Sequence, residues 1–292
     1  MSSHHCLAAK DKRTAHLNEL LVFDLDGTLL NEHEQLSPVT QKALDQLDRL
    51  GINWTVATGR MPHGAREALP NLVFKHPQAY KNGVLLWDLN EDTVFSKIPM
   101  SQQDAIEVCQ RLYAKDIKPW VNTIDHEDNI GAVITGITSD KEKQWSDYLS
   151  SQGIRVQQQS DYSTLPEHVL NIFAATNNPA VLDMSEELAH LDGVAVFAGP
   201  DMYHAGGYWL DIHHSSGTKG DAVQLIKKQL GADKTICFGD SDNDISMFEL
   251  ADECYAMGQG LDELKAIATA TIGSNSEDGI AHFLAQRYGF DL

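Results

Sequence analysis

Cysteine is scarce in this chain of 292 residues, and the few cysteines that it has are far apart. They are Cys6, Cys109, Cys237 and Cys254, and no two of them have the CxxC spacing of a zinc site or a redox motif. A scattered set of this kind excludes a disulfide framework, and we expect a reducing, cytoplasmic location. Cys237 lies inside an apolar run, so we expect it to be a small core residue.

Positive charge is also scarce. The chain has 22 lysines and arginines against 42 aspartates and glutamates, which gives a formal net charge of −20. This excess excludes a nucleic acid or an anionic membrane surface as the main partner, because both are polyanions. A phosphorylated metabolite is an anion too, so a site for one would need local cations: a metal ion, a lysine or helix N-termini.

Long apolar runs are absent as well. No stretch of 18 apolar residues occurs, so we expect no transmembrane helix. Residues 1–20 carry charged side chains and lack the apolar centre of a secretory signal, and we expect residues 1–18 to be an N-terminal extension. A chain of this length with 42% hydrophobic residues is typical of globular proteins and favours two domains over one.

The run from Leu21 to Leu30 is the most informative stretch that is present. An apolar segment leads to Asp24 and Asp26, in a turn that contains Gly27. Side chains alternate along a strand, so a turn at its end is needed to bring both carboxylates into one small volume. Crowded carboxylates repel each other, which predicts a Mg²⁺ site with one aspartate left for nucleophilic or acid–base chemistry. An exposed acidic turn is the alternative.

Three further patches have polar side chains where strands end or helices begin. Thr58 and Gly59 follow an apolar strand, and a hydroxyl beside an approachable backbone N–H suits an anion. Lys219 begins a helix, where a cation opposes the helix dipole, so we expect a bound anion to resolve the conflict. The three aspartates and one asparagine between Asp240 and Asp244 suit a cation with oxygen ligands. Solvated turns and a solvated lysine are the alternatives.

Strands and helices alternate at both ends of the chain, which predicts one α/β domain with a parallel sheet. Residues 21–57 have the pattern of a strand, a helix and a strand, and residues 219–272 repeat the alternation. The carboxyl ends of parallel strands meet at one crevice, so we expect the four patches to converge there. The middle of the chain mixes strand and helix patterns differently. We therefore expect a core of residues 19–86 and 211–292 and an inserted α+β domain of residues 87–210.

Four motifs, in this order, resemble those of the haloacid dehalogenase-like phosphohydrolases, in particular the Cof-type subgroup (subfamily IIB) with a large inserted C2B cap. The motifs are DLDGTL at residues 24–29, TGR at 58–60, TKG at 218–220 and GDSDND at 239–244. The Asn82–Gly83 turn before the insert and the segment 273–280 are also similar to that family. The resemblance covers nearly the whole chain from Leu21 onward and implies a Rossmann-like core with a cap domain.

The resemblance also implies a role for each of the acids. Asp24 would attack phosphorus and form an aspartyl-phosphate. Asp26 would protonate the leaving oxygen, then activate water, and would offer its backbone carbonyl to Mg²⁺. Asp240 would complete the protein ligands of the metal together with Asp24, and Asp244 would support them.

The resemblance also implies four residues that would hold the phosphoryl group. Thr58, the N–H of Gly59 and Lys219 would bind its oxygens and offset charge in the transition state, and Asn243 would touch the phosphate. The implied activity is Mg²⁺-dependent hydrolysis of a small phosphomonoester such as a sugar phosphate, pyridoxal phosphate or flavin mononucleotide. A phosphosugar mutase or phosphotransferase is the alternative, and a signalling receiver phosphorylated on aspartate is less favoured. Oligomeric state cannot be read from these motifs.

Several other polar side chains are better explained by packing than by chemistry. His213 and His214 are neighbours on an expected strand, where adjacent side chains face opposite ways, so we expect no joint metal site. A packing or loop role is likewise expected for Trp120, Asn122, His126 and His204.

Overall fold

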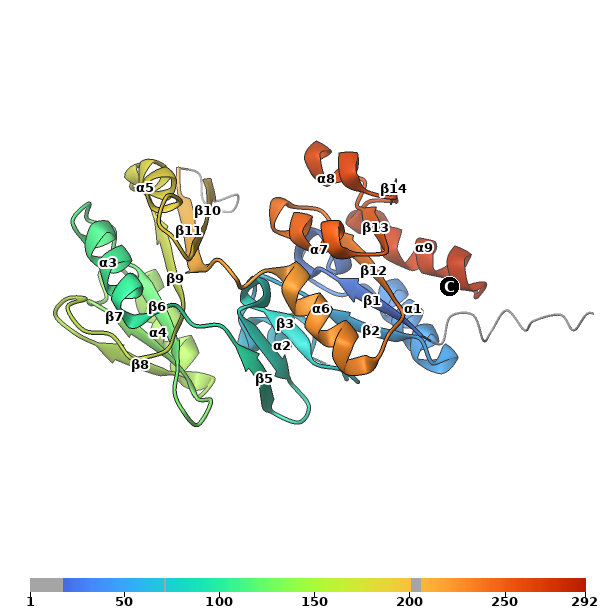
Figure 1. Cartoon of the computed structure of the whole chain (residues 1–292), viewed down its shortest axis with the longest axis horizontal. Coiled ribbons are helices and arrows are strands. Elements are labelled where there is room, and N and C mark those ends of the chain that lie inside the picture. Colours follow the sequence, from blue (N-terminus) through green and yellow to red (C-terminus); the bar gives the residue numbers. More distant parts are fainter. Residues whose placement is uncertain (1–17, 71, 201–205) are drawn as a thin grey trace, which may run out of the picture.

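The computed structural model describes residues 18–70, 72–200 and 206–292. Cys6, His204 and all but the last residue of the expected N-terminal extension lie outside the described residues. The described residues form two units that are joined by two crossings of the chain (Figure 1). The unit that contains β1 and the C-terminus is called the core here, and the unit that contains β6 to β11 is called the insert.

The core is built on a parallel sheet of five strands in the order β14-β13-β12-β1-β2. Its strands are β1 (Glu19–Phe23), β2 (Asn53–Val56), β12 (Lys234–Gly239), β13 (Glu253–Ala256) and β14 (Ala270–Thr271). β1 lies between β2 and β12, so the first and last parts of the chain share one sheet. The expected α/β core with a parallel sheet is therefore confirmed.

Helices cover both faces of this sheet because the side chains of β1 alternate between two apolar clusters. Leu21 and Phe23 pack with residues of α1 and α9 on one face. Leu20 and Val22 pack with residues of α6, α7 and α8 on the other. These helices are α1 (Pro38–Leu50), α6 (Lys219–Leu230), α7 (Ile245–Leu250), α8 (Asp262–Ile267) and α9 (Gly279–Tyr288).

Local signals set the ends of α1. The side chain of Ser37 accepts a hydrogen bond from the N–H of Thr40, and Pro38 is the first helical residue. Gly51 ends the helix with a φ of 72°, a left-handed conformation that costs a glycine little. The next strand, β2, can therefore start two residues later and run parallel to β1.

A short antiparallel sheet extends the core beyond what the sequence analysis identified. It has the order β3-β4-β5 and is joined to the main sheet by a bridge between Ala57 and Ala79. Its strands and the preceding helix are α2 (Pro62–Ala68), β3 (Gln78–Tyr80), β4 (Leu85–Asp88) and β5 (Thr93–Lys97). Strands of three to five residues without clear alternation give little periodic signal, so they were not expected.

The insert contains a mixed sheet of six strands in the order β10-β11-β9-β6-β7-β8, in which only β7 and β8 pair in parallel. The strands are β6 (Trp120–Ile124), β7 (Ile130–Ile134), β8 (Arg155–Gln158), β9 (Val169–Thr176), β10 (Val194–Pro200) and β11 (Tyr208–His214). The helices are α3 (Gln102–Tyr113), α4 (Asp140–Ser151) and α5 (Ala180–Leu188). This is the expected inserted α+β domain.

The expected domain limits fall inside strands. The limit after residue 86 lies within β4, and the limit after residue 210 lies within β11. A strand belongs to one sheet along its whole length, and β4 pairs with core strands whereas β11 pairs with insert strands. We therefore propose that the core passes into the insert at residues 98–101 and returns at residues 215–218.

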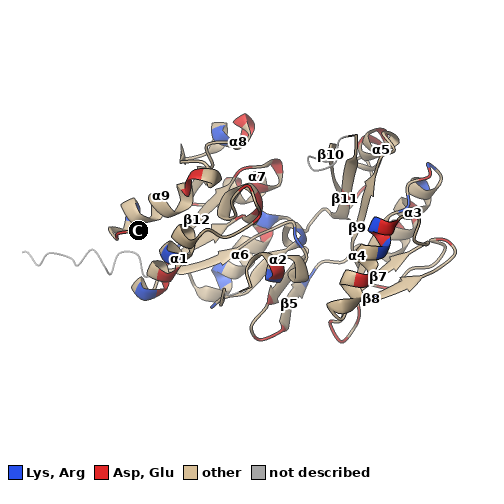
Figure 2. Ribbon diagram, turned by 180° about the vertical axis from the view of Figure 1, so that it is seen from behind, with Lys and Arg blue, Asp and Glu red and all other residues tan. Residues whose placement is uncertain are grey.

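The cysteines and the lack of long apolar runs, both noted in the sequence, can be compared with the structure. Cys109, Cys237 and Cys254 are buried and free. Within the described residues, no helix combines the length and the apolar composition that crossing a bilayer requires. Figure 2 shows acidic positions on helices and loops of both units, with basic positions among them.

Candidate active site

The turn that follows β1 is built around Gly27. Backbone hydrogen bonds from the N–H groups of Leu29 and Leu30 close the turn. Gly27 has a φ of 75°, in the left-handed region that favours glycine. A Cβ at this position would lie 2.3 Å from Oδ2 of Asp240, so any larger residue would collide with that carboxylate. The turn thus lets the loop after β12 approach Asp24 closely.

Lys219 lies at the centre of the site. It is the first residue of α6, and its side chain is completely buried. Its Nζ lies 2.6 Å from Oδ1 of Asp24, 2.6 Å from Oδ1 of Asp244 and 3.3 Å from Oδ1 of Asn243. Burial alone would lower the pKa of Lys219, but the two carboxylates outweigh it and raise the pKa. The cation at this helix start is therefore balanced by carboxylates of the protein itself.

The loop after β12 is folded around the carboxylate of Asp244. Oδ2 of Asp244 accepts hydrogen bonds from the N–H groups of Asp240 at 2.9 Å and Ser241 at 3.1 Å. Oδ1 of Asp240 accepts a hydrogen bond from the hydroxyl of Thr28 at 3.0 Å, which ties this loop to the turn after β1. The two acidic motifs therefore form one cluster.

Asp24, Asp240 and Asp244 offer carboxylate oxygens that all lie within 4.8 Å of one another. Burial raises the pKa of Asp24 well above its usual range, since Asp244 and Asp240 add to burial and Lys219 only partly offsets them. Burial and the charge of Asp244 raise the pKa of Asp240 to about 7. In the part of the chain that the structure describes, Lys219 is the one cation paired with this trio. The remaining negative charge and the oxygen donors suit a divalent cation such as Mg²⁺.

The loop after β2 lies beside this cluster. Thr58 is completely buried, and its hydroxyl accepts a hydrogen bond from the N–H of Arg60 at 3.1 Å. A Cβ added to Gly59 would lie 3.2 Å from Oδ1 of Asn82 and 3.7 Å from Nδ2 of Asn243. Asn243 also contacts the buried lysine, so the structure brings the TGR motif to the acids as expected from parallel strands that end at one edge.

Asp26 lies outside the trio. Its Oδ2 accepts a hydrogen bond from Nε of Arg60 at 2.8 Å, and its Oδ1 lies 2.5 Å from Nη2 of the same side chain. Nη2 of Arg60 also pairs with Glu34 at 2.6 Å. Asp26 is about half exposed, at 48%, and its charge contributes to the raised pKa of Asp24. The two aspartates of the first motif are therefore near each other but have different partners.

Asn82 is a site residue that the sequence analysis treated only as part of a turn. It has a φ of 54°, and its Oδ1 accepts a hydrogen bond from Nδ2 of Asn243 at 3.0 Å. Gly83 follows it with a φ of 98°, and a Cβ there would lie 2.1 Å from the carbonyl oxygen of Thr218. The Asn–Gly pair was the available signal, because such pairs favour left-handed turns.

A buried ion pair next to Asn82 links the core to the insert. Nζ of Lys81 lies 2.6 Å from Oδ2 of Asp211 on β11, and both side chains are about nine-tenths buried. Oδ1 of Asp211 accepts a hydrogen bond from Nδ2 of Asn171 on β9 at 2.8 Å. No local pattern in the sequence predicts this pair, because its two residues are 130 positions apart in the chain.

The residues that were assigned packing roles have structural partners. Nδ1 of His213 lies 3.1 Å from the carbonyl oxygen of His214, and burial lowers the pKa of His213. Nδ1 of His214 instead accepts a hydrogen bond from the N–H of Ser216, so the two rings have different partners. Trp120 is buried in an apolar cluster, and Asn122 donates to Asn171.

Comparisons with known proteins agree with this geometry. Residues 21–284 match the family described as haloacid dehalogenase-like hydrolase. The chain is 28% identical over 286 residues to 5-amino-6-(5-phospho-D-ribitylamino)uracil phosphatase YwtE of Bacillus subtilis, covering 91% of this chain and 96% of that protein. It is 27% identical over 278 residues to pyridoxal phosphate phosphatase YbhA of Escherichia coli, covering 91% and 97%. Among solved structures, the subclass IIB sugar phosphatase BT4131 has a TM-score of 0.72 at 22% identity, covering 93% and 99%.

The chain belongs to the haloacid dehalogenase-like hydrolases. The resemblance to the Cof-type, subclass IIB members is thereby confirmed, as is the expected fold of a parallel-sheet core with an inserted cap. The chain is an enzyme of the phosphatase type.

Proposed function

We propose that this protein hydrolyses a small phosphomonoester with the help of Mg²⁺, through a phosphorylated Asp24. The observation that carries the proposal is the trio of carboxylates around a single lysine, beside a threonine and a glycine at the next strand end. Two of the three carboxylates are buried and the third, that of Asp240, is partly buried. Buried carboxylates that share too little positive charge are typical of a site that receives a cation.

Asp24 is the proposed nucleophile. Its Oδ1 is bonded to Nζ of Lys219, so we assign the attack on phosphorus to Oδ2. The phosphorus–oxygen bond to the leaving group breaks as the aspartyl-phosphate forms. Water then attacks the phosphorus and releases inorganic phosphate together with the free carboxylate.

Asp26 is the proposed proton carrier. It gives a proton to the leaving oxygen in the first step and takes one from water in the second. Arg60 holds its carboxylate in the structure, so this role requires the side chain to turn from Arg60 toward the substrate.

Asp24, Asp240 and the backbone carbonyl of Asp26 are the proposed ligands of Mg²⁺, with Asp244 orienting the lysine and the loop. The ion would supply positive charge to the phosphoryl oxygens. Thr58, the N–H of Gly59, Lys219 and Asn243 are proposed to bind the same oxygens and to offset the charge that develops in the transition state.

The substrate is proposed to be a small phosphorylated metabolite. Relatives named for pyridoxal phosphate and for a ribitylaminouracil phosphate, and a structural neighbour named a sugar phosphatase, support this class. The net charge of −20 argues against nucleic acid as a partner. A cytoplasmic location stays a prediction from the cysteine pattern.

Phosphate release from a panel of metabolites, with and without Mg²⁺, tests this proposal. We expect Mg²⁺-dependent, multiple-turnover release from at least one phosphomonoester. Isomerised sugar phosphate in place of free phosphate would favour the mutase, and a single stable phosphorylation without turnover would favour the receiver. Asp26→Asn should leave the phosphorylated enzyme to accumulate, and normal turnover of that variant would remove the acid–base role of Asp26.

A further inference from the structure

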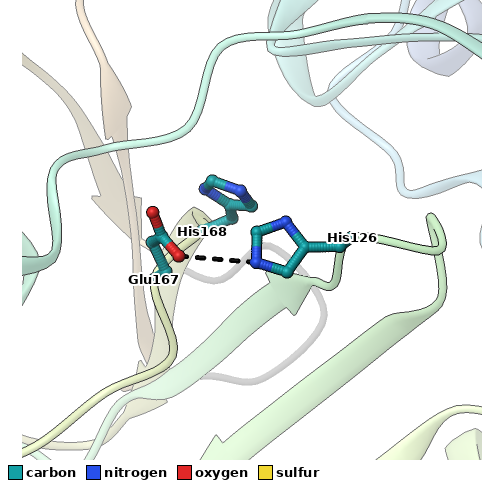
Figure 3. Close-up of side chains that lie close together, drawn as sticks. All are labelled: His126, Glu167 and His168. Carbon is teal, nitrogen blue, oxygen red and sulfur yellow. Dashed lines mark ion pairs between the residues drawn. The ribbon is translucent and has the colours of Figure 1, made fainter.

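A second cluster of metal-ligating side chains lies in the insert, on elements that the active site does not use. His126, Glu167 and His168 each offer one ligand atom, and these atoms all lie within 4.8 Å of one another. Figure 3 shows the three side chains turned toward one another, His126 from one segment and the Glu167–His168 pair from another. A packing or loop role was expected for His126, and no local pattern points to this cluster because Glu167 and His168 are distant from His126 in the chain.

The spacing of this cluster suits a transition metal. Nε2 of His126 lies 3.5 Å from Oε2 of Glu167. Two ligands of a tetrahedral zinc ion, each roughly 2.1 Å from the metal, are about 3.4 Å apart. The ring of His168 is edge-on to that of His126, with 5.1 Å between the ring centroids. Rotation of these side chains, of which those of His126 and Glu167 are exposed and that of His168 is partly buried, would complete a set of three ligands.

The backbone on both sides of the cluster is held in place. Oδ1 of Asp125 accepts hydrogen bonds from the N–H groups of Glu127 and Asn129, which fixes the β6–β7 turn around His126. The carbonyl oxygen of His168 accepts a hydrogen bond from the N–H of Ile124, at a point where the β6–β9 register shifts. Such irregularities in a ladder redirect side chains.

Space for a further ligand adjoins the three side chains. A cavity of about 510 Å³ is lined by all three of them and by parts of β7 and β8. Its size leaves room for a water molecule at the fourth position of a tetrahedral ion. His126 and Glu167 are 76% and 71% exposed, so a metal ion can reach them from solvent.

We propose that His126, Glu167 and His168 bind a zinc-type transition metal ion. Imidazole nitrogen suits Zn²⁺, Ni²⁺ or Cu²⁺, whereas Mg²⁺ prefers oxygen, so this site and the aspartate trio select different metals.

The site lies where the first crossing from the core meets the insert. The N–H of Met100 donates to the carbonyl oxygen of Val169, the residue after His168. Nζ of Lys97 on β5 pairs with Asp128 in the same turn as His126. A bound metal would join the β6–β7 turn to the start of β9 and would stiffen the insert at its junction with the core.

The test uses the full chain without an affinity tag, stripped with a chelator and then kept in excess Mg²⁺ to occupy oxygen sites. Zn²⁺ is titrated by calorimetry and by competition with a chromophoric chelator, and Co²⁺ serves as a spectroscopic probe. We expect one equivalent of Zn²⁺ to bind and Co²⁺ to show the intense visible bands of a tetrahedral site. His126→Ala and His168→Ala should each weaken binding at least about tenfold, which is 1.4 kcal/mol.

His190→Ala is the matched control, because His190 is exposed on the same unit but outside the cluster. It should bind Zn²⁺ like the unaltered chain. Zn²⁺ should also slow amide hydrogen exchange in residues 125–129 of the unaltered chain and not of His126→Ala. Equal Zn²⁺ affinity in all four proteins, or an octahedral Co²⁺ spectrum, would overturn the proposal, and phosphatase activity has no part in the result.

Discussion

Charged side chains gather at both ends of the core sheet, but the two groups differ in balance. At the amino ends of the strands, Glu19 and Glu253 meet Lys234 and Arg287. Among the residues that the structure describes, carboxylates and cations are equal in number in this group, which we call the amino-end cluster. Its members come from the first residues of three neighbouring strands and from the last turn of α9.

The carboxyl ends of the same strands carry the trio of Asp24, Asp240 and Asp244 with Lys219. Here three carboxylates face one paired cation among the residues that the structure describes. The pKa of Asp240 is raised to about 7 by burial and by Asp244, whereas the pKa of Glu253 in the amino-end cluster is lowered to about 2.

The difference suggests that the two ends of the sheet serve different purposes, one for stability and one for binding a ligand. In the amino-end cluster each carboxylate pairs with a cation, and these ion pairs join the strands to α9. A group with surplus negative charge is costly until a cation arrives, so it persists where a ligand supplies that cation. Predictions that exchange or remove charges at the two ends test this comparison.

The largest effect is expected when one carboxylate is neutralised at a time, either Asp24 just after β1 or Glu19 at its start. Asp24→Asn should lower kcat/KM by a factor on the order of 10⁴ or more, because it removes the proposed nucleophile, and should leave the protein as stable or more stable. Glu19→Gln should keep activity and lose roughly 1–3 kcal/mol of unfolding free energy. Steady-state kinetics and denaturant unfolding of both variants measure this. Near-normal turnover by Asp24→Asn would end the assignment of the nucleophile.

The next effect concerns the buried lysine. Lys219→Met leaves two buried carboxylates without their cation and should cost roughly 3–5 kcal/mol of unfolding free energy. Lys227→Met is the matched control on the same helix, because its ion pair with Asp252 is partly exposed and is expected to contribute about 0–1 kcal/mol. Urea unfolding of the two variants compares them. Equal losses of unfolding free energy would contradict the prediction that the ion pairs of Lys219 stabilise the fold more than that of Lys227.

Removal of the divalent cation should have an intermediate effect. Mg²⁺ at about 100 times its dissociation constant should stabilise the protein by roughly 2.7 kcal/mol, because it binds the folded trio and not the unfolded chain. Thermal unfolding with Mg²⁺ and with EDTA measures the shift. The increase in unfolding temperature caused by Mg²⁺ should vanish in Asp240→Asn and persist in Glu253→Gln. If Mg²⁺ stabilised Asp240→Asn as much as the unaltered chain, the cation would bind at another site.

The smallest effect is a pH dependence at the amino-end cluster. Burial alone would raise the pKa of Glu253, but hydrogen bonds from Arg287, Lys234 and Tyr255 lower it to about 2. A carboxyl with a lowered folded-state pKa stabilises the fold above its ordinary pKa, 4.5 for Glu253, and loses that contribution as pH falls toward 2. Glu253→Gln should therefore cost roughly 1–2 kcal/mol at pH 7 and progressively less below pH 4.5.

Unfolding of both proteins between pH 7 and pH 2.5 measures this change. A difference that grows as the pH falls would show that Glu253 is not held as a carboxylate by these partners.

Much of the site could be predicted because its parts are local. Asp24 and Asp240 each follow an apolar run that ends in a turn, and parallel strands bring such ends together. Arg60 was not recognised as the partner of Asp26, because that contact depends on how the loop after β2 folds back over the first turn. Asn82 was missed for a similar reason, since β3 had to be placed beside β2 before its turn could reach Asn243.

The insert was harder to predict than the core. Its strands were expected near Trp120 and Val169, but nothing local says that β6 pairs with β9. That pairing is what brings His126 to His168. The same holds for Lys81 and Asp211. Lys81 follows β3 in the core and Asp211 lies on β11 in the insert, so they meet only when the two units are folded together.

Local patterns in the sequence are enough to predict the class of fold and the strand ends that carry acids. They do so because alternation along strands, helix caps and turn residues act over a few positions. The residues proposed for phosphoryl transfer were assigned through the resemblance of four motifs to a known family. Only the packing of the folded chain establishes which acids share Lys219, that Asp26 pairs with Arg60 and that two histidines meet beside a glutamate. Those contacts join residues up to about 200 positions apart, as Asp24 and Lys219 are, so they depend on strand order and packing rather than on any local pattern.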